Sequence, residues 1–368
     1  MQLFKPTTLS AAILTASMSA AHADVNVVAS IKPVHSLVAG VMQGVGTPSL
    51  IIEGAGSPHS YALKPSQARQ LQNADLIFWM SHDLEAFLEK SIEGIAANAT
   101  AVALADSHGI KKLAFREGGA FDAHDHGDHD DHGHDEHEEH GHDDHDDHGH
   151  DDHDKHEEHG HDEHDEHGHD DHDKHEEHGH DDHDEHGHDD HDEHDHGEFD
   201  PHVWLDPINA KAMVHEIEEA LSAADPANAA AYEANAEKMM GDLDNLVAEI
   251  TADLRPVKDK GFIVFHDAYQ YFENRFGVSA VGSITVSPEV MPGAQRISEL
   301  QEKVNSLDGT CVFSEPQFEP KLVSTVTENT NAGTGVLDPL GTSIDNGPEL
   351  YFTLIRNMSY SIKDCLTD

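Results

Sequence analysis

Short apolar runs alternate with amphipathic segments along the first third of the chain. Runs of about four to eight apolar residues are typical of buried strands, and apolar residues three or four positions apart are typical of helices. The pattern predicts strands at Val25–Ile31, Ser49–Ile52, Ala74–Met80 and Thr100–Leu104, and helices from Pro33, at Ser66–Gln72 and at Leu84–Ile95. Strands separated by single helices favour parallel pairing, so we expect an α/β lobe here.

The last third of the chain repeats this alternation. It predicts strands at Phe262–Phe265, Val278–Ile284, Cys311–Phe313 and Gly335–Leu337, and helices at Tyr269–Phe276, Ile297–Val304, Lys321–Glu328 and Pro348–Ile362. Two helices are predicted before this last third. Ile208–Leu221 looks helical, and Ala227–Leu254 has apolar residues at helical spacing until Pro256 ends the pattern. The fold class expected is α/β: two lobes with parallel sheets, joined by a long rigid backbone helix, with a ligand in the cleft at the strand ends.

Residues 122–198, called the tract below, break both patterns. They contain 28 His among Asp, Glu and Gly, and the 12 letters HGHDDHDKHEEH occur at His148 and again at His167. With almost no apolar residues to bury, we expect the tract to be disordered. So many imidazoles beside carboxylates should bind divalent ions at several weak sites, and a plain acidic spacer would not need them.

The formal net charge of −52 belongs mostly to this segment. Residues 122–200 contain 38 Asp and Glu against Lys155 and Lys174, which is a net charge of −36. The remainder has a net charge of −16, so no surface suited to nucleic acid is indicated.

The N-terminus has the pattern of a secretory signal. Lys5 is followed by an apolar, small-residue stretch from Leu9 to Ala20, and Ala21-His22-Ala23 is a small-x-small cleavage site. A membrane anchor is the alternative, but the apolar stretch is shorter than the roughly 20 residues that span a bilayer. We therefore expect export to the periplasm, with cleavage after Ala23.

These observations divide the chain into five parts. We expect a signal peptide at 1–23, an N-terminal lobe at 24–121 and 199–225, the tract at 122–198, the linking helix at 226–255 and a C-terminal lobe at 256–368. In an oxidising compartment, Cys311 and Cys365 are most simply one disulfide that ties the final helix to the start of a strand. Two buried free thiols are the alternative.

Three histidines outside the tract stand out by their context. His59 lies in a Gly/Pro loop after a strand, His202 lies in DPHVWLDP after the tract, and His266 follows the apolar strand FIVF. Asp338 ends another predicted strand, and three imidazoles with one oxygen suit tetrahedral Zn(II). Each imidazole needs a partner for its other ring nitrogen, and Glu315 and Asp267 are candidates by sequence position. His35, at the start of the first helix, is a further candidate neighbour of the metal.

Several segments together resemble one family. They are IKPVHSLV, EGAGSPHSYALKPSQARQLQNADLIFW, DPHVWLDP, FIVFHDAYQYFENRFG, PGAQRISEL, VFSEPQF and VLDPLG. The mature chain resembles the zinc-specific (ZnuA-like) substrate-binding proteins of bacterial ABC importers, within the wider family of metal-binding receptors and adhesins. The resemblance implies two α/β lobes joined by a rigid helix, a metal between them, and a late disulfide at Cys311 and Cys365.

The resemblance also implies ligands and partners. The metal-binding histidines of the family correspond to His59, His202 and His266, and its late acidic ligand corresponds to Asp338. Some zinc-specific members have Glu before the first histidine, where this chain has Pro58, so the fourth ligand is Asp338 or water. The implied partners are an ABC permease and its ATPase, met by peripheral docking at the inner membrane, and we expect a monomer. A zinc store centred on the tract and a zinc hydrolase are the alternatives, although no HExxH motif supports the hydrolase.

Overall fold

The computed structural model describes residues 25–116, 121, 199–285, 291–307 and 310–367. The predicted signal peptide and the tract lie outside these ranges, so both stay predictions. The described residues belong to one compact unit. In the part of the chain that is described, no helix is long and apolar enough to cross a membrane.

The first sheet confirms the α/β lobe expected at the start of the chain. Its strands pair in the order β2-β1-β3-β4, and every pair is parallel. They are β1 (Val27–Ala29), β2 (Ser49–Leu50), β3 (Leu76–Trp79) and β4 (Thr100–Ala103), and the helices between them are α1 (Lys32–Val41), α2 (Pro65–Gln72) and α3 (Ala86–Ile95). Pro33 lies in the first turn of α1, where its missing N–H costs no hydrogen bond.

The second sheet has the same organisation, with strand order β6-β5-β7-β8 and parallel pairs throughout. Its strands are β5 (Gly261–His266), β6 (Ser279–Thr285), β7 (Cys311–Ser314) and β8 (Gly333–Val336), and its helices are α6 (Gln270–Phe276), α7 (Ala294–Ser306) and α8 (Lys321–Thr327). The last strand begins two residues earlier than predicted, because Gly333 pairs with Cys311 and Val336 with Ser314. Leu337 and Asp338 therefore belong to the loop after the strand.

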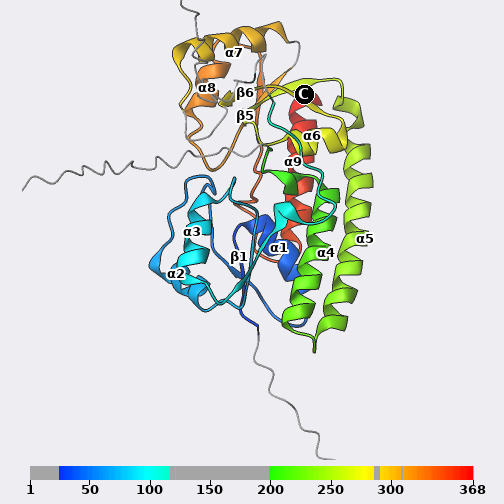
Figure 1. The fold of residues 1–368 in the computed structure, drawn as a ribbon. Coiled ribbons are helices and arrows are strands. Elements are labelled where there is room, and N and C mark those ends of the chain that lie inside the picture. Colours follow the sequence, from blue (N-terminus) through cyan, green and yellow to red (C-terminus); the bar gives the residue numbers. More distant parts are fainter. Residues whose placement is uncertain (1–24, 117–120, 122–198, 286–290, 308–309, 368) are drawn as a thin grey trace, which may run out of the picture. The chain divides into compact units, whose positions relative to one another are not determined.

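Helices α4 (Pro207–Ala224), α5 (Ala229–Leu254) and α9 (Leu350–Thr367) run beside one another in Figure 1. The short helix η2 (Val203–Leu205) precedes α4, η3 (Arg255–Val257) follows α5, and η1 (Leu104–Asp106) contacts α4. The Asp206 carboxylate accepts a hydrogen bond from Ile208 N at 2.8 Å and so caps α4. The expected long helix is confirmed as α5, which has 26 residues.

Helix α9 joins the end of the chain to its beginning. One apolar core includes residues of β1, α1, α4, α5 and α9, whereas a smaller core lies among β5, β6, β7, α7 and α8. The Ser36 hydroxyl on α1 donates to Gly347 O at 2.8 Å and accepts from Tyr351 N at 3.0 Å. The disulfide between Cys311 and Cys365 is confirmed and fixes the far end of α9 to the start of β7.

Candidate metal centre

Three imidazoles from distant parts of the sequence converge on one small cavity. His59 lies in the loop after β2, His202 directly precedes η2, and His266 is the last residue of β5. Ring centroids are 5.4 Å apart for His59 and His202, 5.9 Å for His59 and His266, and 5.2 Å for His202 and His266. One ring nitrogen from each lies within 4.8 Å of the others, a spacing that could accommodate a metal ion. The cavity volume of ≈ 10 Å³ is about that of one small occupant.

His202 is oriented by Asp200, which the sequence analysis did not single out. The Asp200 carboxylate lies 2.7 Å from His202 Nδ1 and also accepts from His202 N at 3.0 Å. Both residues are buried. When this carboxylate is ionised it only accepts hydrogen bonds, so Nδ1 then carries the proton and Nε2 presents its lone pair to the cavity. The Asp-Pro-His sequence contained this signal, since Asp two residues before a histidine can reach its ring.

His266 is oriented in the same way by Glu315, one of the two carboxylates that the sequence offered as candidates. The Glu315 carboxylate lies 2.7 Å from His266 Nδ1, and the two side chains are 1% and 5% exposed. The Nε2 atoms of His266 and His202 are 3.3 Å apart. Two lone pairs at this distance repel each other, so a cation or a shared proton between them stabilises the arrangement.

The pKa values of the pair are displaced in opposite directions. Burial, reinforced by the nearby His266, lowers the pKa of His202 well below its usual value. Burial also lowers the pKa of His266, but the Glu315 carboxylate outweighs that effect, and the net pKa is raised. Burial raises the pKa of Asp200 to about 7. Between the two rings, a proton therefore favours His266 over His202.

Asp338 does not join the three histidines in this structure. Among the described residues, the group that could hold a metal consists of His59, His202 and His266. The Asp338 carboxylate instead accepts hydrogen bonds from Leu340 N at 3.1 Å, Gly341 N at 3.0 Å and Gln317 Nε2 at 3.0 Å, and it also accepts from Thr342 N. These amides use the lone pairs that a metal would need, so the carboxylate organises the 338–342 turn.

Asp267 also has a different partner from the one expected. The sequence offered it as an orienting carboxylate for a histidine, but it forms a bidentate ion pair with the Arg116 guanidinium. The same guanidinium reaches Glu273 on α6 at 2.8 Å. Arg116 was not identified from the sequence, where nothing marks a lone Arg just before the tract.

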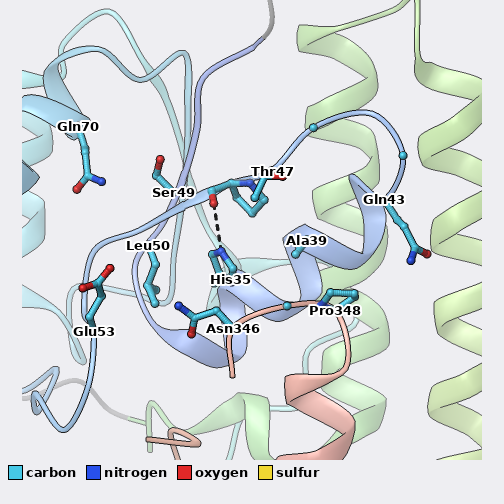
Figure 2. Close-up of a pocket in the computed structure, with 14 residues that line it drawn as sticks. His35, Ala39, Gln43, Thr47, Ser49, Leu50, Glu53, Gln70, Asn346 and Pro348 are labelled. Carbon is cyan, nitrogen blue, oxygen red and sulfur yellow. Dashed lines mark hydrogen bonds between the residues drawn. The ribbon is translucent and has the colours of Figure 1, made fainter. Parts of the chain in front are cut away.

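The structure places His35 in another pocket. Its Nε2 donates to Pro48 O at 3.1 Å, and burial lowers the pKa of the ring. Figure 2 shows this pocket of ≈ 560 Å³, with Gln43, Glu53 and Asn346 in its lining. His35 is not among the residues that line the three-histidine cavity, so it has no part in the site proposed below.

The fold and the cavity together define a two-lobed α/β protein with a candidate metal site of three oriented imidazoles. The sequence profile of the family described as "Zinc-uptake complex component A periplasmic" matches residues 27–365. The chain is 53% identical over 341 residues to the high-affinity zinc uptake system protein ZnuA of Brucella suis, covering 93% of this chain and 91% of the relative. It is 38% identical to that of Haemophilus influenzae, covering 99% of each chain.

Solved structures share the fold. A crystal structure of ZnuA superposes with a TM-score of 0.63 at 19% identity, over 92% of this chain and 99% of that one. The laminin-binding protein Lmb of Streptococcus agalactiae superposes with a TM-score of 0.63 at 18% identity, over 93% and 99%. This chain belongs to the family of periplasmic A components of zinc-uptake complexes. Members of this family are periplasmic substrate-binding proteins rather than enzymes.

Proposed function

We propose that this protein captures Zn(II) in the periplasm and delivers it to an ABC permease powered by its ATPase. It does so as an exported monomer that docks peripherally at the inner membrane, after cleavage behind Ala23. The single observation that supports this most is the arrangement of His202 and His266, whose Nε2 atoms face each other at 3.3 Å while both Nδ1 atoms are held by buried carboxylates. Such carboxylate–histidine pairs are the usual support for zinc-binding imidazoles.

In this proposal His59, His202 and His266 bind the zinc, and water supplies the fourth ligand. Water is favoured over Asp338 because the Asp338 carboxylate is occupied by backbone amides. Catalysis by the bound water is not part of the proposal. Asp200 and Glu315, the carboxylates closest to the cavity by their hydrogen bonds, each hold a histidine and so are not placed as a general base.

The tract has a supporting role in the proposal. Its imidazoles gather zinc at weak exchanging sites, and the ion then passes to the three-histidine site. Deleting residues 122–198 should slow zinc loading and leave tight binding intact. Equal loading rates with and without the tract would remove this role.

Competitive zinc titration tests the function. The protein without the tract is titrated against a strong chelator, beside the same chain with His59→Ala, His202→Ala and His266→Ala. One tight site in the first and none in the second is the expected result. Equal binding by both would show that the ligands are assigned wrongly. Weak binding by both would favour a zinc store centred on the tract.

A further inference from the structure

The two described segments that flank the tract are fastened to each other beside the metal site. These segments, called the stems below, are 111–116 and 199–202. Ala114 and Phe199 form an antiparallel bridge, and Asp200 N donates to Leu113 O at 2.9 Å. The Lys112 ammonium lies 5.8 Å from the centroid of the Phe199 ring. The two stems are therefore paired to each other just before His202 in the sequence.

Helix α6 attaches to both stems at once. The Tyr271 hydroxyl accepts from Leu113 N at 2.9 Å and donates to Asp200 O at 2.8 Å. The Gln270 amide donates to Ala114 O at 3.2 Å and to Asp200 Oδ2 at 3.1 Å. The bond to Oδ2 holds the carboxylate that orients His202. The position of the Asp200 carboxylate therefore depends on α6 as well as on the loop that contains Asp200.

Arg116 completes this arrangement on the side of the other buried histidine. Its guanidinium bridges Asp267, the residue directly after His266, and Glu273 on α6. The Arg116 side chain is 21% exposed, whereas those of Asp267 and Glu273 are each 7% exposed. Glu273 in turn accepts from Ala280 N at 2.8 Å at the start of β6. One guanidinium thus joins the first stem, the turn after His266, and helix α6.

We propose that Arg116 is a positioning residue for the zinc site, which rests on the function proposed above. By binding both Asp267 and Glu273, it holds the turn after His266 against its own stem, 111–116, which is also the stem that pairs with Asp200. The imidazoles of His202 and His266 are thereby held in fixed positions relative to each other, with their Nε2 atoms facing. Arg116 touches no zinc ligand atom and acts through its two carboxylates.

Arg116→Lys in the full chain tests this, because Lys keeps the positive charge but lacks the planar fork of donors that pairs bidentately with Asp267. Zinc affinity of the tightest site is measured by chelator competition at substoichiometric zinc, and Co(II) absorption reports the ligand geometry. The same two signals are recorded for the protein with His59→Ala, His202→Ala and His266→Ala, which keeps the tract but lacks the site. Subtracting them removes the contribution of the tract. We expect the dissociation constant to rise by roughly 10- to 100-fold and the cobalt band to change.

A second variant guards against misfolding from unpaired buried acids. Arg116→Gln/Asp267→Asn/Glu273→Gln removes all three charges together, and it should fold and show the same loss of affinity. Arg356→Gln is the matched control, because it breaks an exposed bidentate pair with Glu249 on α5 and should leave affinity unchanged.

Two results separate this inference from the proposed function. If Arg116→Lys or the neutral triple variant keeps the original affinity and cobalt spectrum, Arg116 only neutralises buried acids and the inference is overturned alone. If the unmodified chain does not differ from its three-histidine variant, the proposed function fails and the inference fails with it.

Discussion

His202 and His266 reach the cavity by different means from His59. The first two are buried, lie next to regular structure, and have their Nδ1 atoms fixed by carboxylates. His59 is partly exposed and lies in a loop with Gly54 at φ +70° and Pro58 before it, where its backbone N–H donates to Ser57 Oγ at 3.3 Å. The buried pair is preorganised for a cation, and we expect the loop histidine to complete the site after the ion arrives.

The largest effect should come from removing one member of the buried pair. His266→Ala deletes a ligand and leaves Glu315 without its partner. Zinc sites are worth roughly 10–16 kcal/mol over four ligands, so one ligand corresponds to a loss of about 100- to 1000-fold. Chelator competition on the tract-deleted protein measures it. His215→Ala, at a 59% exposed position on α4, is the control that should change nothing. A loss below about tenfold would contradict the preorganised pair.

A smaller effect is expected at the loop. His59→Ala should weaken zinc binding by roughly 10- to 50-fold, because water can take the place of a partly exposed ligand. The change should lie mainly in the dissociation rate, measured by stopped-flow transfer of zinc to a chelator. If His59→Ala lowers the zinc affinity more than His266→Ala does, the predicted order of the loop histidine and the buried pair is wrong.

The pair should also make zinc affinity depend on pH. Zinc needs neutral imidazoles, so protons compete as the pH falls through the raised pKa of His266. His202, with its lowered pKa, adds no competition until the solution is more acidic. Affinity should fall by up to about tenfold per pH unit, visible in titrations from pH 8 to 5.5. Glu315→Gln should move the onset to lower pH, since it removes the group that raises the pKa. A flat profile would refute this assignment.

The smallest effect on zinc is expected at Asp338. Asp338→Asn should change affinity by less than about threefold, because its carboxylate holds backbone amides. It should lower the free energy of unfolding by about 1–2 kcal/mol, the usual value of a charged acceptor at such a turn. Calorimetry measures the change in stability and zinc titration measures the change in affinity, both on one sample. A loss of affinity near that of His266→Ala would make Asp338 the fourth ligand.

The sequence predicted both sheets, the long helix and the three histidines that meet. Periodicity finds such elements because the spacing of apolar residues within each segment indicates which of its faces is buried. It could not find Arg116, whose partners Asp267 and Glu273 are more than 150 positions away. Asp338 was assigned by its place after a strand, yet Asp-Pro-Leu-Gly is also a turn sequence in which Asp accepts from the amides that follow. Asp200 lay within reach of local reasoning, because an Asp two residues before a histidine can bond both the backbone N–H and the ring of that histidine.

The packing of α9 has a consequence for how the chain is made. The core around β1 and α1, built from the first residues of the fold, is completed by side chains between Leu350 and Leu366. A chain emerging from the ribosome cannot bury helix α1, which packs on α9, in its final surroundings until these last residues exist. We therefore expect the growing polypeptide to remain loose to the end of synthesis and to fold late, in one cooperative step. That timing suits a polypeptide passed unfolded through a narrow export channel.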